Sequence, residues 1–178
     1  MFFNFKKPEH YGLKVFIWIF IVAMNLIVMI LDEPLKEIGY RGWAFWLVNI
    51  SFFLMEEPDL IKKIVSIVCG AVTGCILAYL TLKLYTGYLT GLGHIGLIIP
   101  VGLSLALVIL CGPFFPAFFN TVTFMYFLAA LIVPADAVTN VWTNCMWAIL
   151  GTIIVNGGCI LIIKQYRKAQ IKKLQSQA

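Results

Sequence analysis

The chain has 178 residues, of which 62% are hydrophobic and only 12% are charged. Its mean hydropathy is +0.96. A water-soluble domain is about half apolar and about a quarter charged. The composition therefore argues against a soluble enzyme, a nucleic-acid-binding module and a disordered chain, and it predicts an integral membrane protein in contact with membrane lipid.

The apolar residues occur in long continuous runs, which indicates helices. Strands of a membrane barrel instead alternate apolar and polar residues over about ten positions. Because a spanning helix needs about 20 apolar residues, the chain has room for about six. We expect an all-α polytopic membrane bundle, with residues 1–163 as one transmembrane domain and residues 164–178 as a basic cytoplasmic tail.

The first two apolar runs differ in length. Leu13–Leu31 resembles a signal peptide, but the acidic and proline residues 32–34 follow it in place of a small-residue cleavage site. We therefore expect an uncleaved first helix. The second run, Trp43–Met55, is short. It crosses the membrane only if its helix begins near Leu35 and the flanking basic side chains reach the interface; otherwise it is re-entrant.

Four further helices are predicted, and glycine and proline signals separate them. The glycine-rich segment Tyr85–Gly96 predicts a loop, and Cys111–Pro116 predicts a tight turn. Pro100 is expected to kink its helix or to lie in the first turns of that helix. Pro134–Asp136 is expected to end the helix that precedes Pro134. The four predicted helices are Leu60–Tyr85, Ile95–Cys111, Phe114–Val133 and Thr139–Ile163.

The distribution of basic residues predicts the orientation. Six crossings place both termini on one side, and that side then carries ten of the 13 Lys and Arg residues. By the positive-inside rule, both termini face the cytoplasm, and the protein is a multi-pass membrane protein. The basic tail is also suited to lie as a helix along the membrane surface, attracted to anionic lipid.

Small residues recur every four positions in the third predicted helix, which suits close contact between helices in lipid. Two interpretations remain open at this point. The ladder can pack against another helix of the same chain, or it can form the interface of a homo-oligomer. Its members are Ser66, Gly70, Gly74 and Ala78.

Neutral polar residues within the last two apolar runs are the candidate site. An amide facing lipid without a partner costs several kcal/mol, about 4–8 on an alkane scale, so these residues should face inward. They can form hydrogen bonds between helices, or they can line a polar path or pocket for a small solute. The candidates are Asn120, Thr123, Asn144, Thr152 and Asn156.

Several kinds of site are not indicated. The middle of each apolar run lacks an ionisable residue, which argues against proton coupling through a buried carboxylate. The five cysteines have no metal-binding spacing, and serines have no neighbouring acid or histidine. We therefore expect no catalytic residues, no metal, no cofactor and no nucleic-acid partner. Asp136 is interpreted as a turn residue, with a binding carboxylate as the alternative.

Phenylalanines cluster at the tight turn before the fifth predicted helix. They can pack around that turn, or they can form a hydrophobic constriction that gates a pore by dewetting. The residues that would form the constriction are Phe115, Phe118 and Phe119.

Three stretches resemble the bacterial inner-membrane family called domain of unknown function 1097. They are the aromatic run 42–53 that leads into Leu60–Lys63 and the Gly70/Gly74 helix, the Pro-small-Phe start at 115–119, and the helix from Trp147 to Gly151 with its basic tail. The resemblance covers most of the chain from about residue 42. It implies a fold and a location, but no activity, because the family has no assigned one.

We expect the protein to be a channel or transporter for a small neutral or weakly charged solute. One alternative is a structural or regulatory membrane protein without catalysis. Another is the substrate-binding membrane subunit of a larger importer, but such subunits carry an AxxxA face on the first helix, and here that run has only Ala23.

Overall fold

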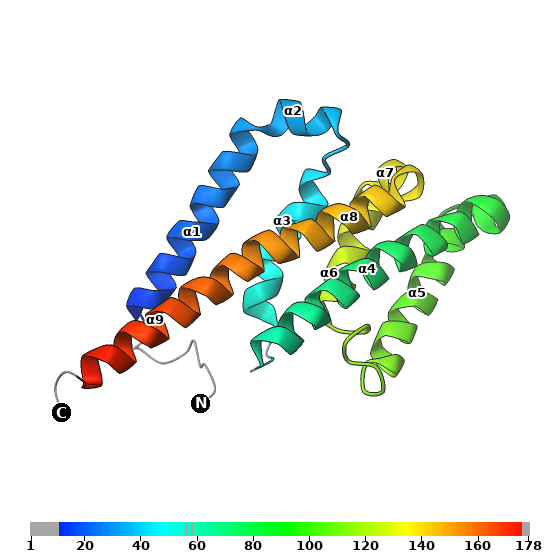
Figure 1. Ribbon diagram of the computed structural model, residues 1–178. Helices are drawn as coiled ribbons and strands as arrows, with labels where there is room; N and C mark the ends of the chain where they lie inside the picture. The colour runs from blue at the N-terminus through cyan, green and yellow to red at the C-terminus, as the bar shows by residue number, and fades with distance from the viewer. Residues whose placement is uncertain (1–10, 56, 58, 176–178) are drawn as a thin grey trace.

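The computed structural model describes residues 11–55, 57 and 59–175, which are helical apart from short turns. Apolar helices follow one another in alternating directions, so that the beginning of α1 and the end of α9 lie at the same end of the molecule (Figure 1). The elements are α1 (Tyr11–Ile30), α2 (Asp32–Glu37), α3 (Gly42–Leu54), α4 (Leu60–Leu84), the π-helix η2 (Tyr85–Leu89), the 3₁₀-helix η3 (Thr90–Leu92), α5 (Gly93–Cys111), α6 (Thr121–Ile132), α7 (Pro134–Thr139), α8 (Val141–Gly151), the π-helix η4 (Thr152–Asn156) and α9 (Gly157–Gln175).

Among the residues that the structure describes, three helices are long and apolar enough to cross a membrane: Gly12–Ile30, Leu60–Leu92 and Val141–Lys172. The apolar helices Gly42–Leu54, Ile95–Cys111 and Thr121–Ile132 are shorter. At about 1.5 Å per residue, α3 with its 13 residues rises about 20 Å, less than the hydrocarbon core of about 30 Å. The structure thus supports a membrane-embedded helical protein through its three long helices.

Two turns differ from the sequence prediction. Residues 85–92, which were expected in a loop, continue the long helix as η2 and η3. Gly93 then makes the turn with φ of 56°, a conformation that favours glycine. A helix satisfies its own backbone polar groups, which favours continuing it in an apolar environment despite Gly87 and Gly91.

The helix expected at Phe114–Val133 begins only at Thr121, so this prediction was also wrong at its start. Residues 112–120 form turns instead. Pro113 and Pro116 lack the amide hydrogens that a helix needs, and Asn120 supplies a better start because its side chain caps α6.

The helices of the second and last apolar runs also differ from the sequence prediction. Residues 38–41 separate α2 from α3, so the helix of the second run does not extend back to Leu35. At the other end of the chain, the last span continues through η4 and α9 to Gln175. The basic tail is therefore helical, but it runs in line with the span rather than as a separate helix (Figure 1).

Helices α4 and α6 pack closely against each other, and the small-residue ladder makes this contact possible. Gly70, Gly74 and Ala78 are buried on α4. A methyl group at Gly74 would lie 2.5 Å from the carbonyl oxygen of Thr123, so a larger residue there would force the helices apart. The ladder face is thus occupied by a helix of the same chain.

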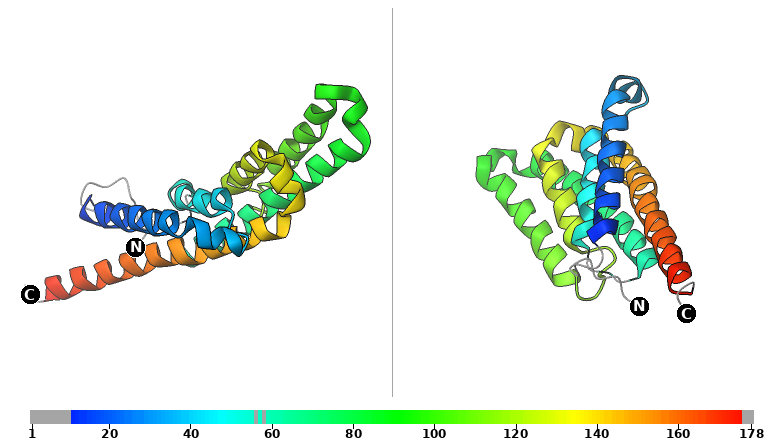
Figure 2. Two further views of the ribbon diagram at one scale, coloured as in Figure 1. Left: turned by 90° about the horizontal axis from the view of Figure 1, so that it is seen from above. Right: turned by 90° about the vertical axis from the view of Figure 1, so that its left-hand side faces the viewer.

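The helices at the two sides of the bundle have different surroundings. Helix α1 lies beside α9 on one side, whereas α5 and the end of α4 stand out on the other (Figure 2). Side chains of α1, α3, α4, α6, α8 and α9 share the main hydrophobic core, which includes Phe52, Tyr126 and Val155.

Candidate functional site

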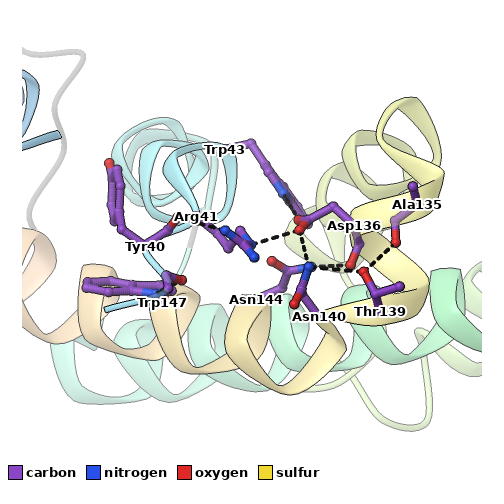
Figure 3. A network of polar contacts seen from close by, with 10 residues as sticks. Tyr40, Arg41, Trp43, Ala135, Asp136, Thr139, Asn140, Asn144 and Trp147 are labelled. Atoms are coloured by element: carbon purple, nitrogen blue, oxygen red, sulfur yellow. Dashed lines mark hydrogen bonds and ion pairs between the residues drawn. The ribbon is translucent and has the colours of Figure 1, made fainter. Parts of the chain in front are cut away.

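A polar cluster lies where α7 meets the turn before α3. The carboxylate of Asp136 accepts a hydrogen bond from Trp43 Nε1 at 2.9 Å and one from Asn140 Nδ2 at 2.7 Å. Arg41 Nε forms an ion pair with Asp136 Oδ1 at 2.8 Å. Figure 3 shows these side chains pointing toward the same carboxylate. Asp136 is therefore more than a turn residue: it joins segments that are far apart in the sequence.

Aromatic residues hold the turn that carries Arg41. Trp147 Nε1 on α8 donates to the carbonyl oxygen of Gly39 at 2.7 Å. The ring of Tyr40 packs edge-on against Trp147 with the centroids 5.0 Å apart. Arg41 also donates from Nη1 to the carbonyl oxygen of Tyr40 at 3.3 Å. The guanidinium is thus positioned by its own turn as well as by Asp136 (Figure 3).

A buried polar stripe leads from this cluster along the last long helix. Asn140, Asn144, Thr152 and Asn156 are spaced at multiples of four residues, and the last three are at most 1% exposed. Asn144 Nδ2 donates to the carbonyl oxygen of Asp136 at 3.4 Å, but its Oδ1 is buried without a hydrogen-bond partner in the part of the chain that the structure describes. Three of the five predicted polar residues therefore lie along one helix, in the interior.

The stripe ends in the π-helix η4, which contains Thr152 and Asn156. Single-turn π-helices are rare and occur often at functional sites. Thr152 Oγ1 donates to the carbonyl oxygen of Ala148 at 2.7 Å and is satisfied within its helix. Asn156 is fully buried, and both its Nδ2 and its Oδ1 lack a hydrogen-bond partner among the described residues. A buried amide without partners requires a physical explanation, because it is costly.

A hydrogen bond between two asparagine side chains joins α1 and α3. Asn49 Nδ2 donates to Asn25 Oδ1 at 2.8 Å, whereas Asn49 Oδ1 is buried without a partner. The pair is the kind of interhelical hydrogen bond expected in lipid.

Asn120 and Thr123 serve a local purpose at the start of α6. Asn120 Oδ1 accepts from the amides of Val122 and Thr123, and its Nδ2 donates to the carbonyl oxygen of Ser66 at 3.2 Å. Thr123 Oγ1 donates to the carbonyl oxygen of Phe118 at 2.5 Å. Their polar atoms are thus engaged in capping and in the α4–α6 contact, and these residues are not part of the stripe.

The phenylalanines of the preceding turn do not surround an interior path. Phe115 and Phe118 are 57% and 49% exposed, and Phe119 is half-buried. The constriction proposed from the sequence therefore has no basis within a single copy of the chain.

Lys63 is a buried residue that the sequence interpretation missed. It is 6% exposed, and its Nζ lies 4.6 Å from the centroid of the Phe52 ring. A signal was available, because Lys63 precedes Gly70 by seven residues and so lies on the buried face of α4. The clustering of Arg41 with Asp136 had no comparable signal in the sequence.

No family model, no curated protein and no solved structure matches the chain. The resemblance to the family of domain of unknown function 1097 thus stays a prediction.

Proposed function

We propose that the protein is a channel or transporter of the bacterial inner membrane that carries a small solute along the stripe from Asn144 to Asn156. The buried, unpartnered amide of Asn156 in a π-helix is the observation that carries this proposal. Buried polar groups are normally hydrogen-bonded. A solute or a chain of waters would supply the missing partners, and a bundle interior is where helical membrane proteins place such sites.

The proposed topology has six crossings with both termini in the cytoplasm. The alternating directions of the helices support it (Figure 1). Helices α3 and α6 are shorter than the three long helices, and the proposal treats them as crossings as well. Arg41 and Asp136 then lie at the outer end of the stripe, and we propose that their ion pair closes this end.

A structural role is the second candidate, because some polar residues are satisfied locally. Thr152 bonds to its own helix, and Asn120 caps α6. In a purely structural protein, replacing Asn156 by leucine should raise stability, since an unpaired buried amide is removed.

The test is solute flux in proteoliposomes, measured by light scattering with urea and glycerol as probes. We expect the wild type to swell faster than empty liposomes, and Asn156→Leu and Asn144→Leu to fall toward the empty level. Gln165→Leu is the matched control, because it removes an exposed amide from the same long helix. Swelling no faster than that of empty liposomes for the wild type would contradict the proposal.

A further inference from the structure

Lys63 lies in the first turns of α4 and is enclosed by other helices. Its neighbour Lys62 is exposed, whereas Lys63 is 6% exposed. Phe52 of α3 lies beneath its ammonium group at 4.6 Å. The carboxylate of Glu57 attracts this ammonium group. A buried ammonium group needs nearby acceptors or negative charge, because burial removes its hydration.

Unpartnered amides lie one turn deeper in the bundle. Asn49 precedes Phe52 by three residues on α3, so the two side chains share a helix face. Phe52 lies beneath the ammonium group of Lys63, and η4, which carries Asn156, packs against both α3 and α4. Asn49 Oδ1 and both polar atoms of Asn156 are buried without hydrogen-bond partners among residues 11–55, 57 and 59–175. Because α3 and η4 pack against each other, these atoms belong to the same part of the interior.

We propose that Lys63 and Asn156 bind a small monovalent carboxylate between α3, α4 and the η4–α9 helix. The inference rests on the proposed function, since it names the substrate class of that path. The ammonium group pairs with one carboxylate oxygen, and Asn156 Nδ2 donates to the carboxylate. Phe52 provides an apolar wall next to the charge.

The burial of Lys63 favours a small free anion over a lipid headgroup. A headgroup phosphate stays at the membrane surface, where Lys62 is the accessible cation. Glu57 competes for the ammonium group, because its carboxylate already attracts it. Glu57→Gln should therefore tighten binding of a carboxylate, and its amide oxygen can still accept the hydrogen bond from the Asp59 backbone.

The experiment follows thermal unfolding of the purified protein in detergent against sodium acetate, with sodium chloride at equal ionic strength as the reference. Wild type and Lys62→Gln should show the same saturable rise in Tm with acetate. Lys63→Gln and Asn156→Leu should raise the Kd for acetate about tenfold or more. Lys63→Arg should retain binding, and it replaces Lys63→Gln as the informative variant if the latter does not fold.

Several results would overturn the site. The site is wrong if acetate raises Tm no more than chloride does. It is also wrong if Lys62→Gln weakens the response to acetate as much as Lys63→Gln does. A response to decanoate without one to acetate would indicate an acyl-chain site instead. Acetate binding without flux of any probe would leave the site standing and contradict transport. Asn156-dependent flux of urea without acetate binding would leave transport standing and contradict the site.

Discussion

The Nε atom of Arg41 lies 2.8 Å from Oδ1 of Asp136 and so joins the turn before α3 to helix α7. The two side chains are 29% and 22% exposed, which makes the pair partly desolvated. Trp43 and Asn140 bind the same carboxylate, so its orientation is determined from three directions. Such a pair is worth more than a surface ion pair, because water screens it less.

Asp136→Asn should lower the free energy of unfolding by about 1–3 kcal/mol, between the values for exposed and fully buried pairs. A double-mutant cycle with Arg41→Gln, measured by unfolding in detergent, isolates the interaction. We expect the double variant to lose less than the sum of the single variants.

The control for this cycle is the pair Lys36–Glu33, at 3.5 Å with side chains 56% and 91% exposed. Glu33→Gln should change stability by less than about 1 kcal/mol. Strict additivity of Arg41→Gln and Asp136→Asn would show that the two residues do not interact in solution.

Gly74→Ala should destabilise the protein by about 1–3 kcal/mol through overpacking. The added methyl group would lie 2.5 Å from the Thr123 carbonyl oxygen and 2.7 Å from Tyr126 Cβ, and backbone atoms cannot easily move aside. Unfolding in detergent measures the effect.

Gly102→Ala is the matched control, because no atom lies within 4 Å of its added methyl group. It should leave stability unchanged or raise it by up to about 1 kcal/mol. Equal effects at the two glycines would contradict the packing explanation.

Much of the helical arrangement could be predicted from local signals. Apolar runs and the four-residue spacing of Gly70 and Gly74 indicate helices and a close-packed face without knowledge of the partner. The start of α6 could not be placed, because the apolar run extends through residues 114–120 while the capping geometry of Asn120 depends on the chain before it. The glycines near residue 90 were misleading, since backbone satisfaction in an apolar environment outweighs their low helix propensity.

The candidate site was predictable only along one helix. Asn144, Thr152 and Asn156 share a periodicity that a sequence displays directly. The pairing of Arg41 with Asp136 depends on how α7 meets the turn before α3, and neither segment has a pattern that specifies the other. Burial of Lys63 was overlooked because lysines near the end of an apolar run usually reach the interface.

Asn120→Ala should lower the free energy of unfolding by about 1–2 kcal/mol, because it removes the cap of α6 and the bond to the Ser66 carbonyl oxygen. Asn120→Ser should recover part of the loss, since a hydroxyl group can still accept from the helix amides. Thr121→Ala, at an exposed neighbouring position, is the control. If Asn120→Ala and Thr121→Ala unfold alike in detergent, the capping role is wrong.

The proposed topology predicts opposite labelling of two exposed positions by a membrane-impermeant maleimide. Glu33 lies on α2 and Lys168 on the basic end of α9, and six crossings place them on opposite sides. In cells whose outer membrane has been removed, Glu33→Cys should react at once, and Lys168→Cys only after the inner membrane is permeabilised. Wild-type protein provides the background, which comes from the partly exposed Cys69 and Cys111, since Cys75, Cys145 and Cys159 are buried. Reaction of both positions before permeabilisation would place them on the same side, with an even number of crossings between them in place of the odd number that the proposed topology requires. Reaction of Lys168→Cys alone would invert the orientation. Because ten of 13 basic residues lie on the inferred cytoplasmic side, the positive-inside rule makes the first pattern the expected one.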